Sequence, residues 1–154
     1  MRKLSFFTLS SALLFAPSLA LAAACGPSGA ITRVKNTSIG AFEYVIFKFH
    51  KPPTVPAYTV KAVTGPFTED PSGNPVVIAG AKFTEVRFDG VFWMCSITEN
   101  LNLPKTAIKG VENIGQFEGV VTYIIGRRAS SHYISNYSYD SGPGYRSIVI
   151  KFKK

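Results

Sequence analysis

Apolar and polar residues alternate with a period of two through most of the chain beyond residue 40, a pattern that predicts β-strands. The most apolar segment runs from Phe42 to Phe49 and is rich in β-branched and aromatic residues. Both of its alternating sets are apolar, so we expect this strand to be covered on both faces or to lie in the middle of the fold. Two prolines after Lys51 end the pattern, because proline has no N–H to give to a β-ladder.

Residues 58–63 predict a second strand, with Tyr58, Val60 and Ala62 facing inward. The Asp-Pro-Ser-Gly-Asn-Pro sequence at 70–75 that follows is a strong turn pattern. The two features together indicate a strand that is followed by a turn.

Residues 82–88 predict another strand, but its pattern is imperfect. Phe83 and Val86 are three positions apart, so a regular strand would place their side chains on opposite faces. We expect a bulge near Thr84 to bring both side chains to one face.

The rest of the pattern is also of strand type. We expect strands at 76–78, 117–126, 132–139 and 145–152, an apolar run at 91–95 and a loop at 98–106. No amphipathic helix, internal repeat or linker is evident in the sequence, and Pro and Gly recur throughout. Short strands at this spacing indicate an all-β, single-domain, mostly antiparallel β-sandwich. A barrel around a small apolar ligand is the less favoured alternative.

The N-terminal composition indicates the compartment. The opening MRKLSFFTLSSALLFAPSLALAAAC has a charged start, an apolar stretch and small-residue cleavage sites. We predict a bacterial secretory signal over residues 1–24, cleaved after Ala22 or Ala24, and a mature β domain over residues 25–154. A retained membrane anchor is disfavoured because the stretch is short and interrupted by Pro17. The protein is therefore expected in the periplasm or outside the cell.

The two cysteines, Cys25 and Cys95, leave the anchoring mode open. In an exported chain they predict one disulfide, which closes a loop of about 70 residues and contributes about 4 kcal/mol on the chain-entropy model. Cys25 also stands at the cleavage point, where a bacterial lipoprotein carries its lipid, although Ala22 replaces the usual leucine. Two unpaired thiols are the remaining alternative.

The net charge of the chain indicates which class of partner it binds. The chain has 17 Lys and Arg residues against 9 Asp and Glu, a net charge of +8. Without Arg2 and Lys3, 15 basic residues remain and the net charge is +6. Positive charge suits acidic partners such as phospholipid, lipopolysaccharide, teichoic acid, peptidoglycan or nucleic acid. Nucleic acid is disfavoured because the chain carries an export signal and no recognition motif.

Catalytic and cofactor chemistry finds little support in the sequence. Ser130, Ser131, His132 and Asp140 are close in the chain, but neighbouring strand residues point to opposite faces and no Gly-x-Ser-x-Gly elbow exists. His50 and His132 do not form a metal-binding spacing, and no Gly-rich phosphate loop opens a helix. We therefore expect no enzyme activity, no metal and no cofactor.

A candidate binding surface lies near the C-terminus. Alternation in the strand at 132–139 places Tyr133, Tyr137 and Tyr139 on one face, shortly after Arg127 and Arg128. Tyrosine rings stack on sugars or pack at protein interfaces, and the planar guanidinium suits carboxylate and phosphate. These five residues are the predicted binding surface. The alternative is that the tyrosines cap the core.

Six segments, taken in order, carry a family resemblance. They are Phe42-Glu43-Tyr44-Val45-Ile46-Phe47, Pro56-Ala57-Tyr58, Asp70-Pro71-Ser72-Gly73-Asn74-Pro75-Val76, Gly80-Ala81-Lys82-Phe83, Phe117-Glu118-Gly119-Val120 and Arg146-Ser147-Ile148-Val149. From about residue 40 to the end, the chain resembles the AMIN-like domain of secreted bacterial proteins. It departs from the family pattern at Tyr44, where Arg is usual, at Ala57, where Gly is usual, and at Lys151, where an acid is common.

The resemblance implies a β-sandwich that binds in the cell envelope without catalysis. Related AMIN domains hold periplasmic amidases and secretins near peptidoglycan, so peptidoglycan or another acidic envelope glycan is the expected partner. The alternative is an accessory or inhibitor domain that docks onto a protein through a sheet edge or the tyrosine face.

Overall fold

A computed structural model describes residues 29–50, 55–91 and 98–154 of the chain, and these residues form eleven strands and no helix. One sheet contains β1 (Ile31–Ile39), β2 (Phe42–His50), β7 (Thr98–Asn100), β10 (His132–Asp140) and β11 (Tyr145–Lys153). A second sheet contains β3 (Ala57–Val63), β6 (Lys82–Asp89), β8 (Ile108–Phe117) and β9 (Val120–Arg127). A short arm consists of β4 (Phe67–Thr68) and β5 (Pro75–Val76).

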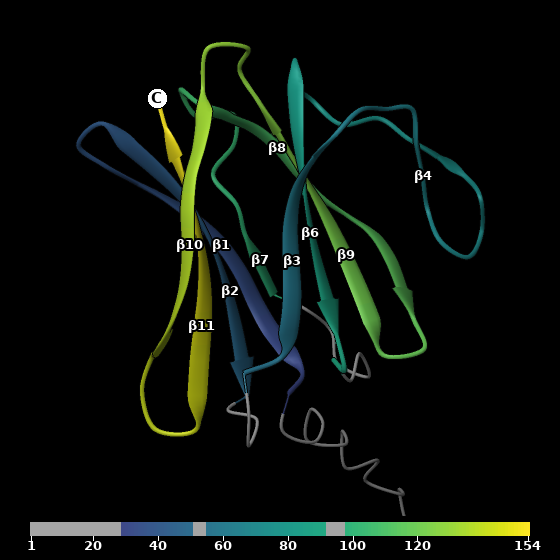
Figure 1. Cartoon of the computed structure of the whole chain (residues 1–154), viewed down its shortest axis with the longest axis vertical. Coiled ribbons are helices and arrows are strands. Elements are labelled where there is room, and N and C mark those ends of the chain that lie inside the picture. Colours follow the sequence, from purple (N-terminus) through teal and green to yellow (C-terminus); the bar gives the residue numbers. More distant parts are fainter. Residues whose placement is uncertain (1–28, 51–54, 92–97) are drawn as a thin grey trace, which may run out of the picture.

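The two sheets pack face to face as a sandwich (Figure 1). The five-stranded sheet has the order β10-β11-β2-β1-β7, and the four-stranded sheet has the order β3-β6-β9-β8. Neighbouring strands are antiparallel except for the parallel pair β1 and β7. The predicted all-β, mostly antiparallel, single-domain sandwich is confirmed.

The core lies between the sheets and is built around β2, the middle strand of its sheet. The Phe47 ring meets the rings of Phe88 and Tyr123 edge-on, with centroids 4.9 and 5.0 Å apart. Phe49 meets Phe88 in the same way at 5.2 Å. Such pairs contribute about 0.5–1.5 kcal/mol each beyond their area burial. The prediction that β2 lies in the middle of the fold with both faces covered is therefore confirmed, since Ile46 on its other face is buried as well.

The expected bulge near Thr84 is wrong. Strand β6 pairs with β3 and with β9 without a register shift, so Thr84 and Val86 face the core and Phe83 faces outward. Phe83 needs no bulge because the ring of Phe67 on the β4–β5 arm covers it, with centroids 4.9 Å apart. Ala62, which pairs with Thr84, is exposed at the edge of the sheet instead of buried.

Three further boundaries differ from expectation. The loop expected at 98–106 begins with β7, and the strand expected at 117–126 is the end of β8 plus β9, joined by a turn at Glu118 and Gly119. Most of β8 was not predicted, because register shifts at 108/110 and 113/115 disturb its alternation. The expected strand at 76–78 is reduced to the end of β5.

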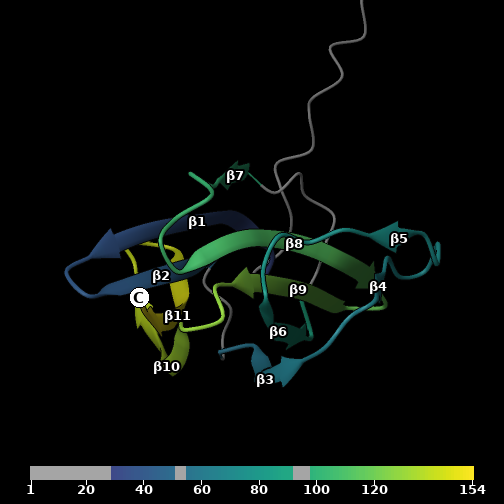
Figure 2. The same ribbon diagram turned by 90° about the horizontal axis from the view of Figure 1, so that it is seen from above.

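The chain between β5 and β6 crosses the outer face of the four-stranded sheet. Its Ala79 carbonyl lies so close to Gly126 on β9 that any side-chain carbon there would overlap it. A side-chain carbon at Gly110 on β8 would stand 3.1 Å from the same oxygen. Figure 2 shows the β4–β5 arm beyond β8 and β9, on the side away from β1 and β2. Glycine thus allows a third layer of chain to lie directly on this sheet.

The predicted signal and both cysteines, Cys25 and Cys95, lie outside the described residues. The disulfide, the lipid anchor and the cleavage site therefore stay predictions, as does most of the apolar run at 91–95. In the part of the chain that the structure describes, no helix is long and apolar enough to cross a membrane.

Candidate functional site

The outer face of the five-stranded sheet gathers cations and aromatic rings from four strands. The strand registers place one row of each strand in the core and the alternate row outside. The cations of the outer row are Arg33, Lys35, Lys48, Lys151 and Lys153. Its aromatic residues are Phe42, Tyr44, Tyr137, Tyr139 and Tyr145. We call these residues the basic face. No Asp or Glu occupies the outer row of the described parts of β1, β2, β10 and β11.

Two of the lysines rest on aromatic rings. The Lys48 ammonium lies 3.9 Å from the centroid of Tyr145, and the Lys151 ammonium lies 3.9 Å from the centroid of Phe42. A cation–π contact orients an ammonium group without cancelling its charge. Both lysines are therefore positioned and still able to attract an anion.

Tyr137 and Tyr139 form an exposed aromatic pair on the basic face. Their ring centroids are 6.3 Å apart, and the residues are 47% and 44% exposed. They lie on β10 opposite Val149 and Ser147 of β11. An exposed pair of phenol rings offers a flat apolar surface with hydroxyl groups, which suits the faces of sugar rings.

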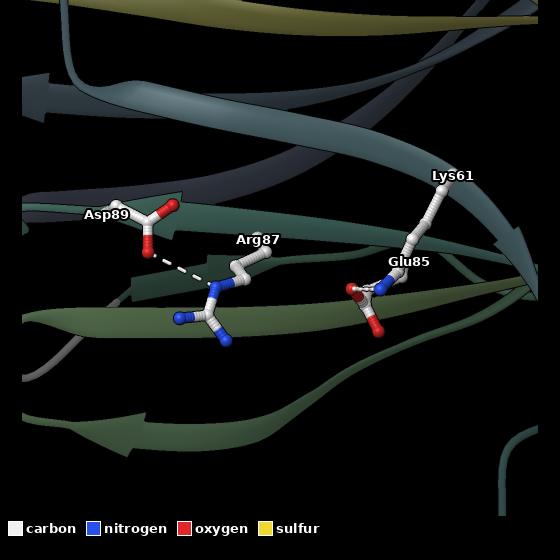
Figure 3. A network of polar contacts seen from close by, with 4 residues as sticks. All are labelled: Lys61, Glu85, Arg87 and Asp89. Carbon is white, nitrogen blue, oxygen red and sulfur yellow. Dashed lines mark hydrogen bonds and ion pairs between the residues drawn. The ribbon is translucent and has the colours of Figure 1, made fainter.

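The outer face of the other sheet has a different charge pattern. There the Lys61 ammonium lies 3.0 Å from a Glu85 carboxylate oxygen, and the Arg87 Nε lies 3.1 Å from an Asp89 carboxylate oxygen (Figure 3). Each cation on this patch has an adjacent acid. Exposed ion pairs of this kind add little stability, but they leave the patch locally neutral. The two faces of the sandwich therefore differ in their attraction for anions.

Tyr133 does not share the face of the other two tyrosines, because β10 carries a bulge. The register with β11 shifts between Tyr133 and Ser135, which turns Tyr133 to the core side. There its ring meets Phe152 at 6.2 Å and its hydroxyl accepts a hydrogen bond from Asn136. Asn136 in turn accepts a hydrogen bond of 2.8 Å from the Tyr58 hydroxyl on β3. The expected row of three tyrosines is wrong, and Tyr133 helps to close the seam between the sheets.

Arg127 is buried and makes internal hydrogen bonds. It is 8% exposed, and its Nε donates to the Thr84 hydroxyl at 3.2 Å. Its Nη1 donates to the carbonyl of Ser131, beyond the turn that follows β9. Removal from water lowers the pKa of the guanidinium below its ordinary value. Arg127 therefore lies inside the fold and not on the surface with the tyrosine pair, whereas the neighbouring Arg128 is exposed.

We expect Arg127→Ala to lower the free energy of unfolding by about 2 kcal/mol, because a buried carbonyl and a buried hydroxyl lose a charged donor. Arg128→Ala is the matched control and should change stability by less than about 0.5 kcal/mol. Urea denaturation of both variants measures the difference. Equal stabilities would show that the buried hydrogen bonds of Arg127 contribute nothing.

Glu43 is the buried charged residue that the sequence analysis did not single out. It lies on the core side of β2 and is fully buried. Its carboxylate oxygens accept hydrogen bonds from the backbone N–H groups of Thr106, Ala107 and Ile108, with N···O distances of 3.0, 2.9 and 2.8 Å. The carboxylate thus ties the chain that enters β8 to the opposite sheet. Its hydrogen-bond partners give it a structural role.

Three cations of the basic face, Arg33, Lys35 and Lys48, were also missed. Arg33 and Lys35 lie on β1, which was not predicted as a strand, and Lys48 was seen only as part of an apolar segment. The spacing of Arg33 and Lys35 by two residues was the available clue. Among the described residues, no group of three or more His, Cys, Asp or Glu is placed to hold a metal ion.

The structure defines an all-β sandwich domain with one basic, aromatic face. Residues 29–152 match the AMIN-like domain family, and the chain belongs to this family. No curated protein and no solved structure matches the chain.

Proposed function

We propose that the protein is a non-enzymatic binding module of the cell envelope that holds an acidic glycan, above all peptidoglycan, on its basic face. The observation that carries this proposal is the set of cations and aromatic rings on one sheet face that has no acid among its described strand residues. Membership in the AMIN-like family supports a role in the envelope.

The shape of the face suits a polymer better than a small ligand. Its nine-residue strands are each about 30 Å long, and neighbouring strands lie about 4.8 Å apart. Cations at both ends of the face, Arg33 and Lys153 among them, bind successive anionic groups. Tyr137 and Tyr139 stack against the sugar between those groups. Many weak contacts of this kind give an affinity that depends on salt.

The test is co-sedimentation of the purified mature protein with isolated sacculi. We expect wild-type protein to pellet at low salt and to be released as salt is raised, because salt screens exposed charges. The double variant Lys48→Ala Lys151→Ala should bind at least about tenfold more weakly, which corresponds to about 1.4 kcal/mol. The matched control, Lys61→Ala Arg87→Ala, removes the same charge from the opposite face and should bind as wild type does.

Two outcomes would overturn the proposal. One is the absence of pelleting at low salt. The other is an equal loss of binding in both double variants, which would show that net charge, and not the basic face, decides the interaction.

A protein-docking module is the second candidate. The observation that favours it is β10, which stands at the end of the strand order of its sheet and carries the exposed Tyr137 and Tyr139. Edge strands accept a partner strand through their backbone groups. This function predicts a stoichiometric partner in a pull-down from envelope extract and no affinity for bare sacculi.

A further inference from the structure

We infer that one end of the basic face is a pocket for the phosphate group of a sugar phosphate; this inference rests on the proposed function and assigns a ligand class to part of the same face. The pocket has a volume of about 380 Å³. Its lining residues are Arg33, Lys35, Lys48, Tyr139, Asp140, Ser141 and Ser147.

Four of the lining residues are neighbours in one row that runs across four strands of the sheet. Arg33 of β1 pairs with Lys48 of β2, and Lys48 pairs with Ser147 of β11. Ser147 pairs in turn with Tyr139 of β10. Lys35 lies two positions from Arg33 and faces the same side. The four strands thus bring guanidinium, ammonium, hydroxyl and phenol groups into one line across the sheet.

The charge of the lining is positive. Three cations stand against one acid, Asp140, and the Asp140 Oδ1 accepts hydrogen bonds from the Nε and Nη2 of Arg146 at 3.0 and 2.9 Å. The Lys48 ammonium rests on the ring of Tyr145, a contact that does not cancel its charge. The three cations outnumber the one carboxylate, so the pocket has a net positive charge and attracts anions.

Ser141 supplies an independent observation. Ser141 lines the pocket, and its hydroxyl oxygen is buried without a hydrogen-bond partner among the described residues. A buried hydroxyl without a partner costs about 1–3 kcal/mol, so such groups in native proteins usually mark a missing water, ion or ligand. Rotation of the Ser141 side chain toward the pocket would let its hydroxyl donate to a ligand oxygen.

A phosphate group fits this lining better than a carboxylate does. A phosphate monoester carries a charge of about −1.5 to −2 near neutral pH and three strong acceptor oxygens, whereas a carboxylate carries one charge. The Arg33 guanidinium forms parallel hydrogen bonds to phosphate, and the two lysines act as point charges. Tyr139 and the adjacent Tyr137 then stack on the sugar that bears the phosphate. Wall polymers and lipid headgroups both carry phosphate, as diesters with one negative charge and two free acceptor oxygens.

The first experiment is an amide NMR titration of the ¹⁵N-labelled mature protein with glucose 1-phosphate. We expect saturable shifts at the amides of Arg33, Lys48, Ser141 and Ser147. Glucose and acetate, at matched ionic strength, should cause much weaker shifts. Arg33→Ala Lys35→Ala should weaken binding of glucose 1-phosphate at least about tenfold, and Ser141→Ala should weaken it about threefold. The side chains of Arg33 and Lys35 are both exposed, so the double variant should have the same melting temperature as wild type.

The control for this titration is Lys151→Ala on the same face but outside the pocket. It should bind glucose 1-phosphate as wild type does while it loses affinity for sacculi. Equal binding of acetate and glucose 1-phosphate would overturn the inference, and so would unchanged affinity in Arg33→Ala Lys35→Ala. Either result leaves sacculus binding as a separate observation, so this inference fails without the proposed function failing.

The second experiment identifies the source of the phosphate. Sacculi are compared before and after hydrofluoric acid removes wall phosphate, and vesicles of phosphatidylcholine are compared with and without phosphatidylglycerol. A loss of binding after acid treatment indicates a wall polymer, and binding to the anionic vesicles indicates a lipid headgroup. Each counts as support only where Arg33→Ala Lys35→Ala binds more weakly than wild type. Equal binding of that variant in both assays overturns the inference.

Discussion

Replacement of Glu43 by alanine is expected to lower the free energy of unfolding by about 4 kcal/mol, because a buried carboxylate that accepts hydrogen bonds from three backbone N–H groups, two of them buried, is lost. The N–H groups of Thr106, Ala107 and Ile108 all donate to this side chain. They lie in the chain that enters β8, and water cannot reach the buried N–H groups of Ala107 and Ile108 without opening the core. Domains of this size are stable by about 5–15 kcal/mol, so the variant should be marginal at 37 °C. Urea denaturation followed by tryptophan fluorescence measures the loss.

Glu43→Gln tests the contribution of the negative charge, because glutamine has nearly the same size and shape as glutamate. The amide keeps one acceptor oxygen but brings an NH₂ group against backbone donors, so we expect a loss of about 2 kcal/mol, between alanine and wild type. Glu112→Ala removes an exposed acid from β8 and should change stability by less than about 0.5 kcal/mol. If Glu43→Ala were as stable as Glu112→Ala, the hydrogen bonds of the Glu43 carboxylate to the chain that enters β8 would not stabilise the fold.

The second large effect is expected from Gly126→Ala, which should lower the free energy of unfolding by about 3 kcal/mol or more, at the upper end of the range for overpacking. The new methyl group would overlap the carbonyl oxygen of Ala79, and its carbon would stand 3.0 Å from the carbonyl carbon. Both obstacles are backbone atoms, so neither β9 nor the crossing chain moves cheaply. Thermal and urea denaturation measure the loss.

Gly110→Ala is the graded comparison for this prediction. Its methyl group would stand 3.1 Å from the same Ala79 oxygen, so a shift of a few tenths of an ångström relieves the contact. We expect a loss smaller by at least about 1 kcal/mol than that of Gly126→Ala. A reversed order would mean that the chain between β5 and β6 does not rest on β9.

The residues expected to determine stability and the residues proposed to bind the ligand lie in different parts of the molecule. Glu43 and Gly126 stabilise the sandwich and its outer layer, whereas the basic face lies on the opposite side of the five-stranded sheet from the core. Variants of outer-row residues such as the half-buried Lys48 and Lys151 are therefore expected to change binding with little effect on stability. This separation makes the binding proposals testable in folded protein.

The sequence alone determined the class of fold. Alternation in β2, β10 and β11, together with frequent Pro and Gly, was enough for an antiparallel sandwich, because the period of two is a local property of the strand. The apolar density of β2 also placed it in the middle of a sheet. The ordered family motifs pointed to the AMIN-like family, which the match over residues 29–152 shows.

Only the tertiary structure decided which residues share a face. The bulge at Ile134 moves Tyr133 away from Tyr137 and Tyr139, and packing at the end of β9 buries Arg127. The cations of the basic face come from β1, β2 and β11, and the register that aligns Arg33, Lys48 and Ser147 joins residues more than a hundred positions apart in the chain. Registers and bulges depend on contacts between distant strands, which leave no local pattern in the sequence. The class of fold and the family were thus readable from the sequence, whereas the composition of the basic face required the fold.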